Sequence, residues 1–189
     1  LQNYENPDGS PRTWNIRGPE DTRALFWESP YWVVNNDRGN DNRDRIYGNV
    51  SLKYDVLPGL SITGSARTDL YNFQVNDRLA SGSAANIAYA ERLTVANREN
   101  NFELLANYNT TLGSDFTLDA TVGGNLRQDE YSTSNSKTSG GLSVPGLYTI
   151  EASVDRPSRS DFMSSKEVQS VFGRASFGWR SLLYVDVTG

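Results

Sequence analysis

Polar and apolar residues alternate along six stretches of this chain, and this alternation limits its possible folds more than any other feature. In residues 45–56, the apolar side chains occupy even positions and most polar side chains odd positions. A period of two places the two sets on opposite faces of a β-strand, and no segment repeats its apolar residues at the helical spacing. The pattern predicts an all-β chain with strands at about residues 45–56, 60–73, 100–112, 116–131, 167–179 and 183–189.

The predicted strands are long, and the connections between them alternate between short and long. Strands of soluble proteins usually have ~5–6 residues, whereas a tilted strand that crosses a membrane needs ~9–11. Short hairpin loops are predicted at 57–59, 113–115 and 180–182, and long loops at 74–99 and 132–166. Short periplasmic turns that alternate with long extracellular loops are typical of transmembrane β-barrels. We therefore predict a segment of antiparallel strands from a large transmembrane barrel, with residues 1–44 as an extracellular loop region leading into it.

Aromatic residues on the apolar faces agree with this prediction. Tyr54, Phe116 and Trp179 lie within a few residues of the short turns, where lipid-facing aromatics form the periplasmic girdle of a barrel. Phe102, at the opposite end of its strand, would belong to the outer girdle. The alternative is that these rings belong to the core of a soluble β-sandwich. Because bacterial membrane barrels begin at about eight strands, we expect the barrel to include strands outside this sequence.

The residue types that are missing exclude most catalytic chemistries. The chain has no cysteine and no histidine, and therefore no thiolate nucleophile, imidazole ligand or serine–histidine triad. A net charge of −5 is opposite in sign to the basic surface that binds nucleic acid. The Asn- and Asp-rich stretch 35–44 fails the calcium-loop template, because Gly39 and Gly48 occupy positions that need oxygen ligands. We expect no enzyme activity, no catalytic residues, no cofactor, no metal site and no nucleic-acid partner.

Two regions of the chain resemble a known family. Residues 40–55, and 170–179 followed by 183–189, resemble the barrel of SusC/RagA-type TonB-dependent transporters. Ser29-Pro30-Tyr31-Trp32 is similar to the family's Asn-Pro-Tyr-Trp. The resemblance implies a barrel of ~22 strands in the bacterial outer membrane, in contact with its lipid, and a plug domain that is not in this sequence. It also implies a SusD-like surface lipoprotein as a lid, and TonB as the energy source through regions absent here.

Import is the function that this resemblance implies. We predict oligosaccharides as the cargo, with peptides as the alternative; a soluble carbohydrate-binding β-sandwich and a surface barrel acting as adhesin or enzyme are further alternatives. The polar strand faces supply the residues expected to line the lumen: Arg45, Lys53, Asp55, Arg67, Asp69, Asp119, Arg127, Arg174 and Asp186. The other interpretation of these charges is structural ion pairing without substrate contact.

Aromatic residues before and between the strands are candidates for contact with substrate or lid. Flat rings stack on sugar rings, and neighbouring Asn and Arg side chains bond to hydroxyl groups. The candidates are Trp14, Trp27, Tyr31, Trp32, Tyr89 and Tyr131. Packing inside a folded loop, or against the lid, is the alternative role for each of them.

Overall fold

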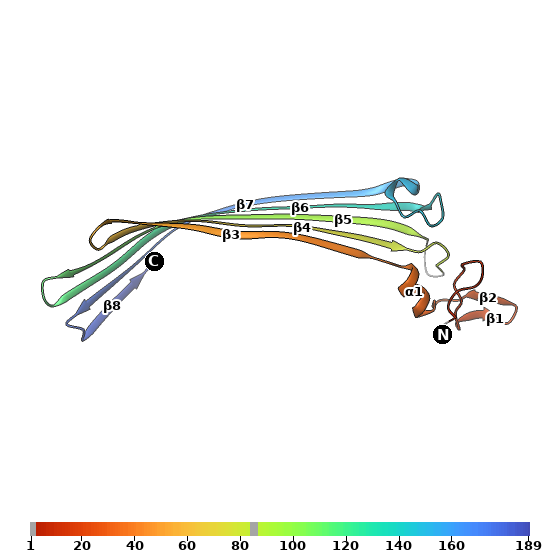
Figure 1. Cartoon of the computed structure of the whole chain (residues 1–189), viewed down its shortest axis with the longest axis horizontal. Helices are drawn as coiled ribbons and strands as arrows, with labels where there is room; N and C mark the ends of the chain where they lie inside the picture. The colour runs from red at the N-terminus through yellow and green to blue at the C-terminus, as the bar shows by residue number, and fades with distance from the viewer. Residues whose placement is uncertain (1–2, 84–86) are drawn as a thin grey trace. The chain divides into compact units, whose positions relative to one another are not determined.

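The computed structural model describes residues 3–83 and 87–189, and most of them are in strands. Six strands form one sheet in chain order (Figure 1). They are β3 (Asn40–Leu57), β4 (Leu60–Leu79), β5 (Tyr89–Leu112), β6 (Phe116–Leu142), β7 (Ser153–Trp179) and β8 (Leu183–Thr188). Each predicted strand is present, so the all-β fold class and the run of neighbouring antiparallel strands are confirmed.

Smaller elements precede and connect these strands. A hairpin of β1 (Ile16–Gly18) and β2 (Asp21–Ala24) is followed by the short helix α1 (Pro30–Asn36), and η1 (Ile150–Ala152) is one turn of 3₁₀ helix before β7. Pro30 is the first residue of α1. The N–H groups of the first helical turn have no partner within the helix, so proline loses no hydrogen bond at this position. Among the described residues, no helix is long and apolar enough to cross a membrane.

The strands extend well beyond their predicted ends, and this corrects the predicted loops. The segments 74–99 and 132–166 are strand for most of their length, leaving connections of only 80–88 and 143–152. Polar side chains occupy both faces of these extensions, so no alternation in hydropathy marks them. Polar side chains of neighbouring strands bind one another along these extensions. For example, Nδ2 of Asn135 on β6 donates to Oε1 of Glu91 on β5 over 2.8 Å.

The short turns match their predicted positions with one difference. Three residues connect β5 to β6 and β7 to β8 as predicted, whereas only Pro58 and Gly59 connect β3 to β4. Gly59 has a φ of +84°, and a Cβ atom there would collide with the carbonyl oxygen of Asn109. This turn therefore requires glycine for both its conformation and its space.

The chain divides into two compact units. The first unit comprises residues 1–44, 72–95 and 132–162, and the second comprises residues 45–71, 96–131 and 163–189. The first unit contains the buried apolar side chains, which are Ala24, Trp32, Ala80, Ala90 and Ala152. In the second unit none of the described apolar side chains is buried. The described residues hold no second large sheet that could cover it, so they do not form the alternative β-sandwich.

Candidate functional site

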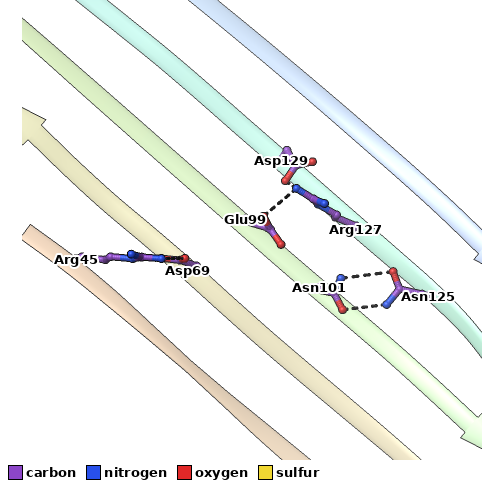
Figure 2. A network of polar contacts seen from close by, with 7 residues as sticks. All are labelled: Arg45, Asp69, Glu99, Asn101, Asn125, Arg127 and Asp129. Carbon is purple, nitrogen blue, oxygen red and sulfur yellow. Dashed lines mark hydrogen bonds and ion pairs between the residues drawn. The ribbon is translucent and has the colours of Figure 1, made fainter.

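Polar side chains of the second unit bind one another across neighbouring strands. Nε of Arg45 on β3 donates to Oδ1 of Asp69 on β4 over 2.9 Å, and Nη2 of Arg45 bonds the other oxygen of the same carboxylate (Figure 2). This is the bidentate geometry in which the planar guanidinium fork matches a carboxylate. Both residues belong to the predicted lumen wall, and the structure brings them together.

Arg127 on β6 lies between two carboxylates. Its Nη2 is 2.9 Å from Oε2 of Glu99 on β5, and its Nε is 3.1 Å from Oδ1 of Asp129 on its own strand (Figure 2). Beside this cluster, Nδ2 of Asn125 donates to Oδ1 of Asn101 over 2.9 Å, and Nδ2 of Asn101 donates to Oδ1 of Asn125 over 3.5 Å. The result is a polar network between β5 and β6 in which the guanidinium has two carboxylate partners.

Most of the other predicted wall residues are also paired. Arg67 meets Glu103 across β4 and β5 at 3.3 Å, Arg174 meets Asp186 across β7 and β8 at 3.6 Å, and Lys53 meets Asp55 within β3 at 3.5 Å. Exposed pairs of this kind contribute about 0–1 kcal/mol each. Their main effect is therefore to balance charge, which supports the interpretation as structural ion pairs. Asp119, which no ion pair engages within the described residues, lines an open groove of about 320 Å³ with Asn107, Thr121 and Arg174.

The sequence prediction missed the acidic partners of two arginines. The polar face of β5 and β6 consists of odd-numbered residues. The three carboxylates are also odd-numbered, so the alternation could have assigned them to the polar face: Glu99, Glu103 and Asp129. The sequence prediction assigns Glu99 to a loop, because the hydropathy pattern begins only at residue 100. Sequence alone also does not say which carboxylate stands opposite which arginine.

The opposite face of the second unit is apolar and exposed. Val50, Leu104 and Val122 are more than half exposed, at 65%, 61% and 56%. The predicted girdle residues Tyr54, Phe102, Phe116 and Trp179 are exposed as well, and the Phe116 ring stacks on Phe177 with 5.4 Å between centroids. Contact of this face with lipid stays a prediction.

The aromatic candidates of the first unit have different environments. Trp14 and Trp27 are 67% and 68% exposed. The hydroxyl of Thr13, the residue before Trp14, donates to the carbonyl oxygen of Trp27 over 2.8 Å and so connects the two segments. Trp32 is only 1% exposed. Its indole is buried within the first unit, which agrees with the alternative role of packing inside a folded loop.

The three candidate tyrosines also differ. Tyr31 stacks on Tyr4 with 6.5 Å between ring centroids, and Tyr131 is exposed. The hydroxyl of Tyr89 donates to Oδ2 of Asp77 over 2.9 Å, and Nζ of Lys137 lies 3.8 Å from the centre of its ring. Burial, and next the bond to Asp77, raise the pKa of Tyr89 to about 12, so the phenol stays a neutral donor. Substrate contact by these tyrosines stays a prediction.

Several solved structures are similar in fold to this chain. A structure of the RagAB peptide importer in its open-open state matches 96% of this chain with a TM-score of 0.79 and 13% identity. The fold is that of a RagA-type barrel segment. The closed-closed state of the same importer matches 95% of the chain, with a TM-score of 0.77 and 12% identity. A further RagAB peptide transporter structure matches 96%, with a TM-score of 0.73 and 14% identity. No protein-family model and no curated protein matches the chain.

The RagA-type likeness confirms the predicted resemblance at the level of fold. The chain spans about a fifth of the length of the matched chains, at 20%, 21% and 20%. The proteins that it resembles are described as transporters, which agrees with the expectation that this chain is not an enzyme. Within the part of the chain that the structure describes, no group of three or more acidic residues is placed to hold a metal ion.

Proposed function

We propose that this chain forms part of a TonB-dependent importer barrel in the bacterial outer membrane and that the cargo is peptide. The observation that carries the proposal is the likeness of nearly the whole chain to RagAB peptide importers. The two faces of the sheet support it, because a membrane barrel turns an apolar face to lipid and a polar face to its lumen. The paired charges of the polar face would then form a hydrated wall with little net charge.

The edges of the sheet support a larger barrel. Strands β3 and β8 each have one neighbour in the six-stranded sheet, and β3 is exposed along its whole length. A membrane barrel leaves no strand edge unpaired in lipid, because an unpaired backbone group there costs several kcal/mol. We infer that strands outside these 189 residues pair with both edges.

Peptide is favoured over the oligosaccharide predicted from the sequence. The similar structures are described as peptide importers, and none of the three is described as a glycan importer. Oligosaccharide import remains a second candidate because the indole rings of Trp14 and Trp27 are exposed, and such rings stack on sugars. The family resemblance further implies a SusD-like surface lipoprotein and TonB as partners, and we include both in the proposal.

The cargo can be tested by purifying the intact transporter with its lipoprotein partner and identifying the molecules that copurify. We expect a mixture of peptides, and uptake by cells should be competed by peptides. Copurification of an oligosaccharide without peptides would overturn the choice of cargo in favour of the second candidate.

The membrane location has a separate test. The intact protein should need detergent for extraction and should migrate differently on gels with and without heating, as closed barrels do. Solubility in buffer without detergent would contradict the barrel, whatever the cargo.

A further inference from the structure

A cavity in the first unit gathers three arginine side chains that the lumen wall does not use. The cavity has a volume of about 210 Å³, and its lining includes Arg38, Arg78 and Arg92 together with Asp77, Glu91 and Tyr148. Sites for drug-sized ligands usually have about 300–1,000 Å³, so this cavity suits a single chemical group rather than a whole molecule of that size.

These three arginines differ from the paired arginines of the sheet. Arg45, Arg67 and Arg127 each have a carboxylate partner. Arg38, Arg78 and Arg92 take part in no ion pair within residues 3–83 and 87–189. Guanidinium groups stay protonated at any physiological pH, so the cavity carries three positive charges without such a partner.

Each guanidinium is held by its Nε atom. Nε of Arg38 donates to the Asn35 carbonyl over 2.9 Å, Nε of Arg78 donates to the Asn36 carbonyl over 3.2 Å, and Nε of Arg92 donates to Oδ1 of Asn76 over 3.2 Å. A guanidinium has five N–H donors, so four remain on the terminal nitrogens of each side chain. The side chains are thus positioned by their inner nitrogen, while within the described residues no side-chain partner engages the terminal donors, which are available to a ligand.

Tyr148 contacts one of the three arginines, Arg78. The Arg78 guanidinium carbon lies 4.5 Å from the centre of the Tyr148 ring, and the backbone N–H of Ser81 donates to the Tyr148 hydroxyl over 3.1 Å. This stacking orients the plane of the guanidinium before any ligand arrives, which reduces the entropy lost on binding.

The two acidic residues that line the cavity, Asp77 and Glu91, have other partners. Asp77 accepts the hydroxyl of Tyr89, and Glu91 accepts Nδ2 of Asn135 and pairs with Lys137 at 3.0 Å. Accordingly, these two contacts hold the pKa of Glu91 below its usual value, the amide of Asn135 being the larger cause. Lys137 balances the charge of Glu91, whereas the bond from the neutral Tyr89 phenol leaves Asp77 charged. The three arginines therefore still outnumber the one lining carboxylate that pairs with no cation within the described residues.

We propose that this arginine cavity binds a phosphate group. A phosphate carries about 1.5–2 negative charges and presents three acceptor oxygens when it is attached to a larger molecule, whereas a carboxylate offers one charge and two oxygens. Three guanidinium forks match the larger acceptor set and the larger charge. The phosphate can come from free inorganic phosphate or from the headgroup of a phosphorylated glycolipid. This proposal does not depend on which cargo the transporter imports.

The test uses the intact transporter that contains this chain, in detergent micelles, with inorganic phosphate as the probe. Calorimetric titration should show saturable binding. We expect at least about a tenfold loss of affinity in Arg78→Gln and in Arg38→Gln, since each variant removes a charge-assisted hydrogen bond to the phosphate. Within the described residues, the Arg38 side chain donates only to the nearby Asn35 carbonyl, so its variant should fold even if Arg78→Gln does not. Arg156→Gln removes an exposed arginine on β7 and is the matched control, which should bind as the wild type does.

The source of the phosphate is distinguished by ³¹P NMR of the purified transporter. A phosphorylated glycolipid that copurifies with the wild type, and is lost from Arg38→Gln, identifies a headgroup; saturable binding of inorganic phosphate without such a lipid identifies free phosphate. Absence of both from the wild type would overturn the proposal. So would equal loss in Arg156→Gln, or binding of succinate at least as tight as that of phosphate.

Discussion

The guanidinium of Arg45 donates two hydrogen bonds to the carboxylate of Asp69, although 24 positions separate the two residues along the chain. The contact spans β3 and β4 and is exposed to solvent. It is thus a product of strand pairing, and its strength can be measured separately from the strands themselves.

A double-mutant cycle of Arg45→Ala and Asp69→Ala should give only a weak coupling energy, because water screens the charges of these exposed side chains. The measurement is the free energy of unfolding of the intact barrel in denaturant, for the wild type, both single variants and the double variant. A strong coupling would contradict this expectation and would mean that the pair is shielded from water in the complete protein.

Val50→Arg and Ser51→Arg test the two faces of β3. If the Val50 face meets lipid, an arginine there should destabilise the barrel by about 2–4 kcal/mol in a bilayer, the cost measured for arginine at the midplane. Ser51 is the next residue along the strand and belongs to the polar face, so its variant is the matched control and should cost much less. Equal losses in unfolding experiments from liposomes would contradict the assignment of the faces.

Replacement of Gly59 by alanine should destabilise the turn between β3 and β4 by about 1–3 kcal/mol. The cause is its φ of +84° together with the collision of a new Cβ with the Asn109 carbonyl. At Gly48, a new Cβ would meet nothing within 4 Å, and φ is not in the left-handed region, so Gly48→Ala is the control. Denaturant unfolding should rank the Gly48 variant as the more stable.

Trp32→Ala should destabilise the first unit by about 3–5 kcal/mol, as expected when a fully buried large side chain is removed. Trp14→Ala, at a site that is 67% exposed, should change stability by no more than about 0.5 kcal/mol. Limited proteolysis of the residues before β3 gives the comparison. Equal protease resistance of the two variants would show that the Trp32 site is not a core.

The raised pKa of Tyr89 predicts that the stability of the folded protein decreases at alkaline pH. Its pKa in the folded protein is about 12, above the ordinary value of 10.0, so its stabilising contribution is present below pH 10 and is lost as the pH rises from 10 to about 12. Tyrosinate absorbance at 295 nm should show a component titrating near pH 12. Tyr89→Phe should remove this component, and Tyr131→Phe, which leaves Tyr89 and its contacts in place, should retain it.

The alternation of polar and apolar residues was enough to assign the two faces of the sheet. Alternation along residues 45–56 assigns Val50 to the apolar face and Ser51 to the polar face, because the side-chain period of a strand is a local property of the backbone. Because this pattern is local, it failed to predict strands where it is absent, as around Asn76 and Arg92. Both faces are polar there, so hydropathy indicated a loop where strand pairing forms β4 and β5.

Which side chains meet depends on strand register and packing, and the sequence pattern did not predict it. Arg127 could have paired with several carboxylates, and the alignment of β5 beside β6 selected Glu99. Trp32 and Trp14 are both indoles in the region before β3, yet folding of the first unit buries the first and exposes the second. Cross-strand partners and burial depend on registers and contacts between distant segments, and these are fixed by turn geometry and packing rather than by the pattern along a single strand.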